Sequence, residues 1–228
     1  MGMPVTAILG LGREIGDAVA RRFSETGHHV IAADPSAERL ATARNGVPDD
    51  VIFHHGELYT RLGLRNAFTA ALEGFGRIDN AVIIPEIEEA DTVFDFAKDK
   101  FDKAMARSTM ALQVFAERIA LQDDLPSVGV ERQRQKGTVT FVLSYSAIAS
   151  MPGRFTESVS QGAVLSVMRA GSIELADKSI RVNAIVAIRP REDKTENWTA
   201  RRTPLGRTAQ GDEIADACRF LASPEAAF

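Results

Sequence analysis

This chain of 228 residues has a single cysteine, no long apolar run and no excess of basic residues, and each of these features excludes a class of protein. A single cysteine, Cys218, excludes an internal disulfide and fits a reducing compartment, so we expect a cytoplasmic protein with a buried, inert thiol. No apolar run is long enough to span a bilayer, which predicts that the chain has no membrane segment. The net charge of −4 lacks the basic excess of a nucleic-acid-binding protein. The four histidines form two adjacent pairs on predicted strands, where neighbours point to opposite faces, so we expect no metal site.

Short apolar runs alternate with helical patterns from one end of the chain to the other. Strands are predicted at 5–9, 29–33, 51–54, 78–84, 138–144 and 180–188, and helices near 14–26, 36–45, 60–74, 94–121, 156–177 and 211–222. The segments 122–136 and 189–210 are predicted to be loops. This alternation predicts one α/β domain over residues 1–228, a Rossmann-like doubly wound parallel sheet with helices on both faces.

A glycine-rich turn follows the first predicted strand, in the sequence ILGLGREIG. Gly10 allows a tight turn, Gly12 relieves crowding, and Gly16 lets the next helix pack closely, so that backbone amides can hold a pyrophosphate. Asp34 ends the second strand, where an acid accepts ribose hydroxyls and favours NAD over NADP. The competing interpretation is that Asp34 caps the helix expected from the following PSAERL segment.

Four motifs in the right order resemble the short-chain dehydrogenase/reductase family. They are the glycine turn, GRIDNAV at the fourth strand, IRVNAI at the sixth, and TPLGRTAQGDEIADACRFLASPEA near the end. The resemblance covers nearly the whole chain and implies a Rossmann fold, an NAD(P) cofactor and kinship with oxidoreductases. The family's final strand, after the last helix, is expected to be missing here. Its absence would leave the sixth strand as an apolar edge that a partner subunit would have to cover.

The cofactor positions that the resemblance implies depart from the family pattern. The second glycine of the family turn falls on Glu14, and Arg13 beside it matches a position where a basic residue favours NADP. Glu57 stands at the adenine-contacting aspartate position. The family's N-N-A-G turn is replaced by a segment containing Pro85 and Glu86, and the acids continue through EIEEAD. Carboxylates close to a pyrophosphate repel it, so NAD binding is expected to be weakened or lost.

All four catalytic positions of the family also carry other residues. The asparagine position falls on Ser108, the serine on Tyr145, the tyrosine on Ser158 and the lysine on Gly162. A tyrosine donates a proton near neutral pH only when a neighbouring ammonium lowers its pKa. A serine hydroxyl is a far weaker acid and glycine carries no charge, so we expect the usual mechanism to be absent.

Three functions fit this pattern. The first, which we favour because catalytic and cofactor positions are replaced together, is a non-catalytic structural or regulatory subunit. It would belong to a homo-oligomer, or to a hetero-oligomer with an active relative, with helices 94–121 and 156–177 as the interface that the resemblance implies. The second is an NAD(H)-dependent oxidoreductase that acts on a carbonyl or alcohol through Tyr145, with Arg154 or Arg169 lowering its pKa; the competing interpretation is that this ring merely fills space. The third is a sensor of a small molecule or dinucleotide.

Overall fold

The computed structural model describes residues 2–11, 14–85, 90–96, 98–122, 135–188 and 203–227. Six strands form one sheet in the order β3-β2-β1-β4-β5-β6, and every pairing is parallel. The strands are β1 (Val5–Leu9), β2 (His29–Asp34), β3 (Ile52–His55), β4 (Asn80–Ile83), β5 (Gly137–Ser144) and β6 (Ile180–Ala187). The predicted doubly wound parallel sheet is confirmed, and the strand bounds differ from the prediction by one or two residues.

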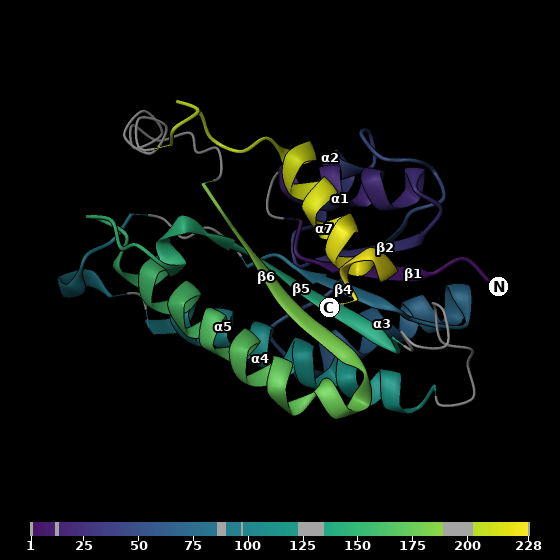
Figure 1. The fold of residues 1–228 in the computed structure, drawn as a ribbon. Helices are drawn as coiled ribbons and strands as arrows, with labels where there is room; N and C mark the ends of the chain where they lie inside the picture. The colour runs from purple at the N-terminus through teal and green to yellow at the C-terminus, as the bar shows by residue number, and fades with distance from the viewer. Residues whose placement is uncertain are drawn as a thin grey trace.

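Helices cover both faces of the sheet (Figure 1). One face carries α1 (Glu14–Glu25), α2 (Ala37–Ala43) and α7 (Gly211–Ala222), and the other carries α3 (Arg61–Phe75), α4 (Lys98–Ala120) and α5 (Phe155–Glu174). Four short 3₁₀ helices complete the described elements: η1 (Val93–Asp95), η3 (Tyr145–Ala147), η4 (Ala176–Lys178) and η5 (Pro224–Ala226). Of the two predicted loops, residues 123–134 and 189–202 lie outside the described residues, and 203–210 contain neither helix nor strand.

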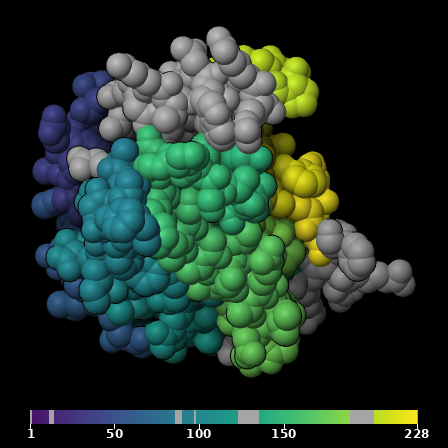
Figure 2. Space-filling model, turned by 90° about the vertical axis from the view of Figure 1, so that its left-hand side faces the viewer, coloured from purple at the N-terminus to yellow at the C-terminus, as the bar shows by residue number. Residues whose placement is uncertain are grey.

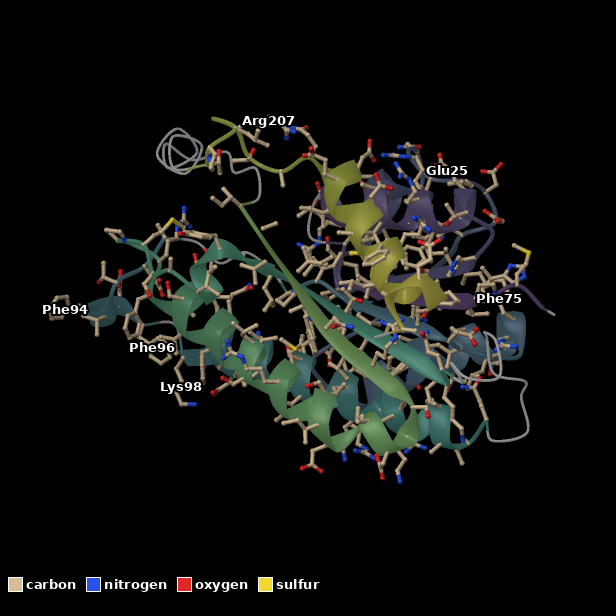
Figure 3. All side chains as sticks on the ribbon, viewed as in Figure 1. Glu25, Phe75, Phe94, Phe96, Lys98 and Arg207 are labelled. Carbon is tan, nitrogen blue, oxygen red and sulfur yellow. The ribbon has the colours of Figure 1, made fainter. Side chains whose placement is uncertain are left out.

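The helix predicted over residues 94–121 is divided in two. Thr92 and Asp95 form a capping box that encloses η1, and Phe96 then takes an extended ψ of 118° before α4 begins at Lys98. The helical pattern of the sequence did not reveal this break, because the Thr92–Asp95 box is itself a helix-start signal and no local signal marks the extended residue Phe96, which is labelled in Figure 3.

Successive residues of β1 point to opposite faces of the sheet and enter two separate cores. Ala7 and Leu9 pack with Phe68 and Phe115 from α3 and α4, whereas Ile8 packs with Phe23 from α1. All of these side chains are almost completely buried. The chain runs from β1 outward to β3 and then restarts at β4 on the other side of β1, so the strand order reverses between β1 and β4. Ligands of such sheets bind at this reversal, beyond the carboxyl ends of the strands.

The sheet of the described residues ends at β6, which pairs with β5 along its whole length. No strand follows β6 in the described part of the chain, so β6 forms an edge.

Candidate functional site

The glycine turn lies at the strand-order reversal and has room only for glycine at its first position. Gly10 has φ of +91°, a conformation that other residues avoid, and its N–H donates to the carbonyl of Ala33 at 2.8 Å. A Cβ at Gly10 would stand 2.5 Å from the carbonyl oxygen of Ile84. The turn therefore brings the ends of β1, β2 and β4 into direct contact.

Gly16 has the close packing that the sequence predicts. Its N–H donates to the carbonyl of Leu11 at 2.6 Å, and a Cβ there would lie 2.3 Å from that same oxygen. Two other predicted cofactor residues, Gly12 and Arg13, lie outside the described residues, as do the side chain of Glu14 and all of Glu86.

Asp34 ends β2, as predicted, but its carboxylate is engaged by the protein itself. It is 1% exposed, and one oxygen accepts the N–H of Leu11 at 2.8 Å. The other oxygen accepts the N–H of Ser36 at 2.7 Å and Nε of Arg39 at 2.9 Å. Ser36 in turn caps α2. The carboxylate thus ties the glycine turn to the residues that begin α2, and that Asp34 also accepts ribose hydroxyls stays a prediction.

The segment after β3 brings Glu57 to the rim of the crevice. Glu57 is exposed and hydrogen-bonds with Tyr59, which raises the pKa of that phenol, while the positive charge of Arg107 acts in the opposite direction. Arg107 therefore lies within electrostatic reach of this segment, although it comes from α4. Sequence reasoning did not single out Arg107, since a lone arginine in a helical pattern is ordinarily a surface residue.

The four positions matching the catalytic set are brought to the same end of the sheet. Ser108 is completely buried on α4, Tyr145 begins η3 directly after β5, and Ser158 and Gly162 lie one turn apart on α5. Gln161 of α5 fixes this arrangement, because its side-chain oxygen accepts the N–H of Ser144 at 3.0 Å. Of the two arginines predicted to tune Tyr145, Arg154 is buried just before α5 and Arg169 is exposed farther along it.

Gly162 leaves room for a side chain, and two of the other matching positions carry buried hydroxyls. A Cβ at Gly162 would meet only the carbonyl oxygen of Ala147, at 3.7 Å, so a side chain has room to start there. The hydroxyls of Ser108 and Ser158 are buried and make no hydrogen bond in the described part of the protein. Neither a tyrosine nor a lysine stands at positions 158 and 162.

A hollow of about 400 Å³ opens beside Ser158. Its wall combines apolar side chains with hydroxyls, and the residues include Val93, Ser150, Met151, Phe155 and Val159. Figure 2 shows the segment around residues 90–105 next to the start of α5 on this face. The volume falls within the usual range for small-molecule sites.

Asp91 has a different role from the one expected for the acidic EIEEAD run. Its carboxylate accepts the N–H of Thr156 at 3.0 Å, and its own N–H donates to the carbonyl of Gly153 at 3.1 Å. Asp91 therefore caps the start of α5 rather than facing a pyrophosphate. The sequence contained the acid but gave no sign of its partner 65 residues away.

A glycine turn at the order reversal of a six-stranded parallel sheet defines a Rossmann-type fold. The chain belongs to the short-chain dehydrogenase/reductase family: a family model described as Enoyl-(Acyl carrier protein) reductase matches residues 10–228.

Its relatives are named as dehydrogenases and reductases. Meso-2,3-butanediol dehydrogenase of Serratia marcescens is 25% identical, over 98% of this chain and 89% of its own length. 2-(R)-hydroxypropyl-CoM dehydrogenase of Xanthobacter autotrophicus is 26% identical, over 98% of this chain and 93% of its own length. The crystal structure of a 3-ketoacyl-(acyl-carrier-protein) reductase from Brucella melitensis, complexed with NADH, is similar with a TM-score of 0.82 at 23% identity, covering 100% of this chain and 93% of that one. The crystal structure of levodione reductase is similar with a TM-score of 0.83 at 22% identity, covering 100% of this chain and 93% of that one.

Two further observations concern the described residues only. No group of three or more histidine, cysteine, aspartate or glutamate side chains among them is arranged to hold a metal ion. None of their helices is long and apolar enough to cross a membrane.

Proposed function

We propose that this chain is a non-catalytic short-chain dehydrogenase/reductase that acts as a structural or regulatory subunit of an oligomer. The observation that carries this proposal is that Ser158 and Gly162 occupy one turn of α5, which Gln161 holds against the end of β5, and supply neither a phenol nor an ammonium. General acid–base catalysis contributes about a hundred- to ten-thousand-fold in rate, and this chain lacks the usual groups for it.

The residues around Asp34, where the ribose of NAD was predicted to bind, support the same proposal. Asp34 is 1% exposed and already accepts hydrogen bonds from Leu11, Ser36 and Arg39, so an NAD ribose would have to displace part of this network to reach the carboxylate. At Asp34 the described residues therefore fit NAD poorly.

Exposed apolar side chains on α5 support the proposed oligomer. Ile173 of α5 is 76% exposed and Val159 is 40% exposed, although burial would stabilise both. We propose α4 and α5 as the contact with a second copy or an active relative. Light scattering of the pure chain tests this: Ile173→Glu is expected to reduce the oligomer, whereas Leu62→Glu, at an equally exposed position on α3, leaves it intact. An unchanged mass in Ile173→Glu would remove α5 from the interface.

Catalysis is tested by incubating the pure chain with NADH or NADPH and carbonyl compounds, and with NAD or NADP and alcohols. The expected result is no turnover above the rate without protein. Measurable turnover would overturn the proposal in favour of a reaction through Tyr145. Loss of that turnover in Tyr145→Phe would then establish the phenol, and unchanged turnover would exclude it.

A second candidate function is a small-molecule sensor, and the hollow beside Ser158 favours it. Its apolar wall and its hydroxyls suit a small, mainly apolar ligand with one or two oxygens. Ligand-dependent changes in oligomer mass or in thermal unfolding would support this function, and Ser158→Trp, which fills the hollow, is expected to abolish them.

A further inference from the structure

Phe94 is the most exposed large apolar side chain among the described residues. It is 97% exposed, and Figure 3 shows its ring pointing away from the rest of the molecule. The capping box of Thr92 and Asp95 fixes the turn that carries it, and the hydroxyl of Thr92 accepts the N–H of Phe94 at 3.3 Å. An aromatic ring held out on a fixed turn loses little conformational entropy when a partner covers it.

The hollow beside Ser158 lies next to this ring but is not filled by it. Val93, the neighbour of Phe94 in η1, lines the hollow, whose volume is about 400 Å³. Among the described residues that line it, Asp91 alone is charged, and its carboxylate already accepts the N–H of Thr156 at 3.0 Å. The hollow therefore suits a neutral, apolar guest of the size of a small molecule or an aromatic side chain.

The ring and the hollow are attached to the same helix start. On one side of η1, Asp91 caps the beginning of α5. On the other side, Phe96 packs edge-on against Phe155 with ring centroids 5.7 Å apart, and Phe155 also lines the hollow. Because both flanks of η1 are tied to α5, the projecting ring and the hollow keep a fixed spacing.

A second copy of the chain supplies a matching projection. Two copies related by a two-fold axis form each contact twice, so that each ring enters the hollow of the other copy. The exposed parts of the apolar side chains at this surface amount to about 400 Å² per copy, and with a polar rim two copies bury about 1,000 Å². These side chains are Val93, Phe94, Phe96 and Val159. A buried area of this size is typical of a weak, reversible dimer.

We propose that η1 and the hollow form a self-complementary contact through which two copies of this chain dimerise, each inserting Phe94 into the hollow of the other. The proposal rests on the proposed role as an oligomer subunit and names the second copy as the partner at this surface. It does not depend on the α4–α5 contact, because Phe94 lies before α4 and Ile173 lies near the far end of α5.

Sedimentation velocity over a series of protein concentrations tests the proposal. The reference chain carries Ile173→Glu, so that the proposed α4–α5 contact does not contribute. Adding Phe94→Ala is expected to raise the dissociation constant of the dimer at least about a hundredfold, about tenfold for each of the two contacts. Ser150→Trp fills the hollow from an exposed position outside both helices and is expected to have a similar effect. Leu62→Ala removes a side chain on α3 that is 70% exposed, and this control is expected to match the reference.

A mixture of the Phe94→Ala and Ser150→Trp chains tests the reciprocal exchange itself. Each variant alone can form no complete contact. A mixed pair forms one, between the ring of the Ser150→Trp chain and the hollow of the Phe94→Ala chain. The mixture is therefore expected to dimerise at least about tenfold more tightly than either variant alone. No recovery in the mixture would overturn the exchange.

Two other results would overturn the proposal. Unchanged dimerisation after Phe94→Ala would exclude the ring from the contact and leave the hollow to a small ligand. A reference chain that stays monomeric at every concentration would exclude the contact altogether. If the wild type still forms an oligomer in that case, the α4–α5 contact and the proposed function stand, so the two proposals fail separately.

Discussion

Acidification is expected to destabilise this protein through His28, which precedes β2. Burial lowers the pKa of His28 from 6.5 to about 4; Asp79 opposes this shift and Arg219 adds to it. The ring packs edge-on against Phe23, with centroids 4.9 Å apart, and Nδ1 lies 2.9 Å from the hydroxyl of Thr6.

The hydrogen-bond network fits a neutral ring at His28. The side-chain amide of Asn80 donates to the hydroxyl of Thr6 at 3.2 Å, which leaves the hydroxyl hydrogen for Nδ1 of His28. A protonated ring would instead donate from Nδ1 to the second lone pair of the Thr6 oxygen. Charging His28 therefore reverses this bond, and the cost of protonation comes mainly from burying the charge.

The magnitude follows from proton binding in the two states. Above 6.5, the usual pKa, the ring is neutral both folded and unfolded, so stability does not depend on it. As the pH falls toward 4, only the unfolded chain takes up the proton, and stability decreases throughout this window. Without any correction for solvent screening, this shift lowers the free energy of unfolding by about 2 kcal/mol between about pH 7 and about pH 5. Because His28 is only partly buried, we expect about 1–2 kcal/mol.

Urea unfolding, followed by circular dichroism, measures this loss in the wild type and in His28→Asn. Asparagine does not titrate, and its side-chain oxygen can accept the hydroxyl hydrogen of Thr6. The variant is therefore expected to lose less stability than the wild type between about pH 7 and about pH 5. The difference between the two losses is the contribution of His28. Equal losses in both proteins would refute the reasoning.

Three other predictions concern single residues. Gly16→Ala forces a Cβ onto the backbone of Leu11 and is expected to lower the free energy of unfolding in urea by more than about 3 kcal/mol. Gly162→Ala, at a helical position with room for a side chain, is expected to leave this free energy unchanged or to raise it by up to about 1 kcal/mol. Equal effects of the two substitutions would contradict this prediction. Asp34→Ala leaves the N–H groups of Leu11 and Ser36 without their acceptor and is expected to cost about 2–4 kcal/mol, so a loss below about 1 kcal/mol would mean that these bonds matter little. Burial raises the pKa of the Cys218 thiol to about 12, so a thiol reagent is expected to leave it unmodified in the native state and to react fully in denaturant.

The sequence was sufficient for the fold because the signals that specify it are local. Apolar runs, helical periodicity and a glycine turn lie within a few residues of one another, and they predicted six parallel strands and the helices between them. The order of motifs also placed Ser158 and Gly162 one turn apart on α5, as the structure has them. The break before α4 was missed because the capping box at Thr92 resembles helical sequence.

The sequence alone determined which residue types stand at the positions that match the family's catalytic set, with serine at 158 and glycine at 162. Only the tertiary structure decided what the charged residues do. Asp34 receives a hydrogen bond from Leu11, 23 residues away, Asp91 caps a helix 65 residues later, and Arg107 lies within electrostatic reach of Tyr59 from a distant helix. Such partners depend on where long side chains point after distant elements pack, and no local pattern encodes that direction.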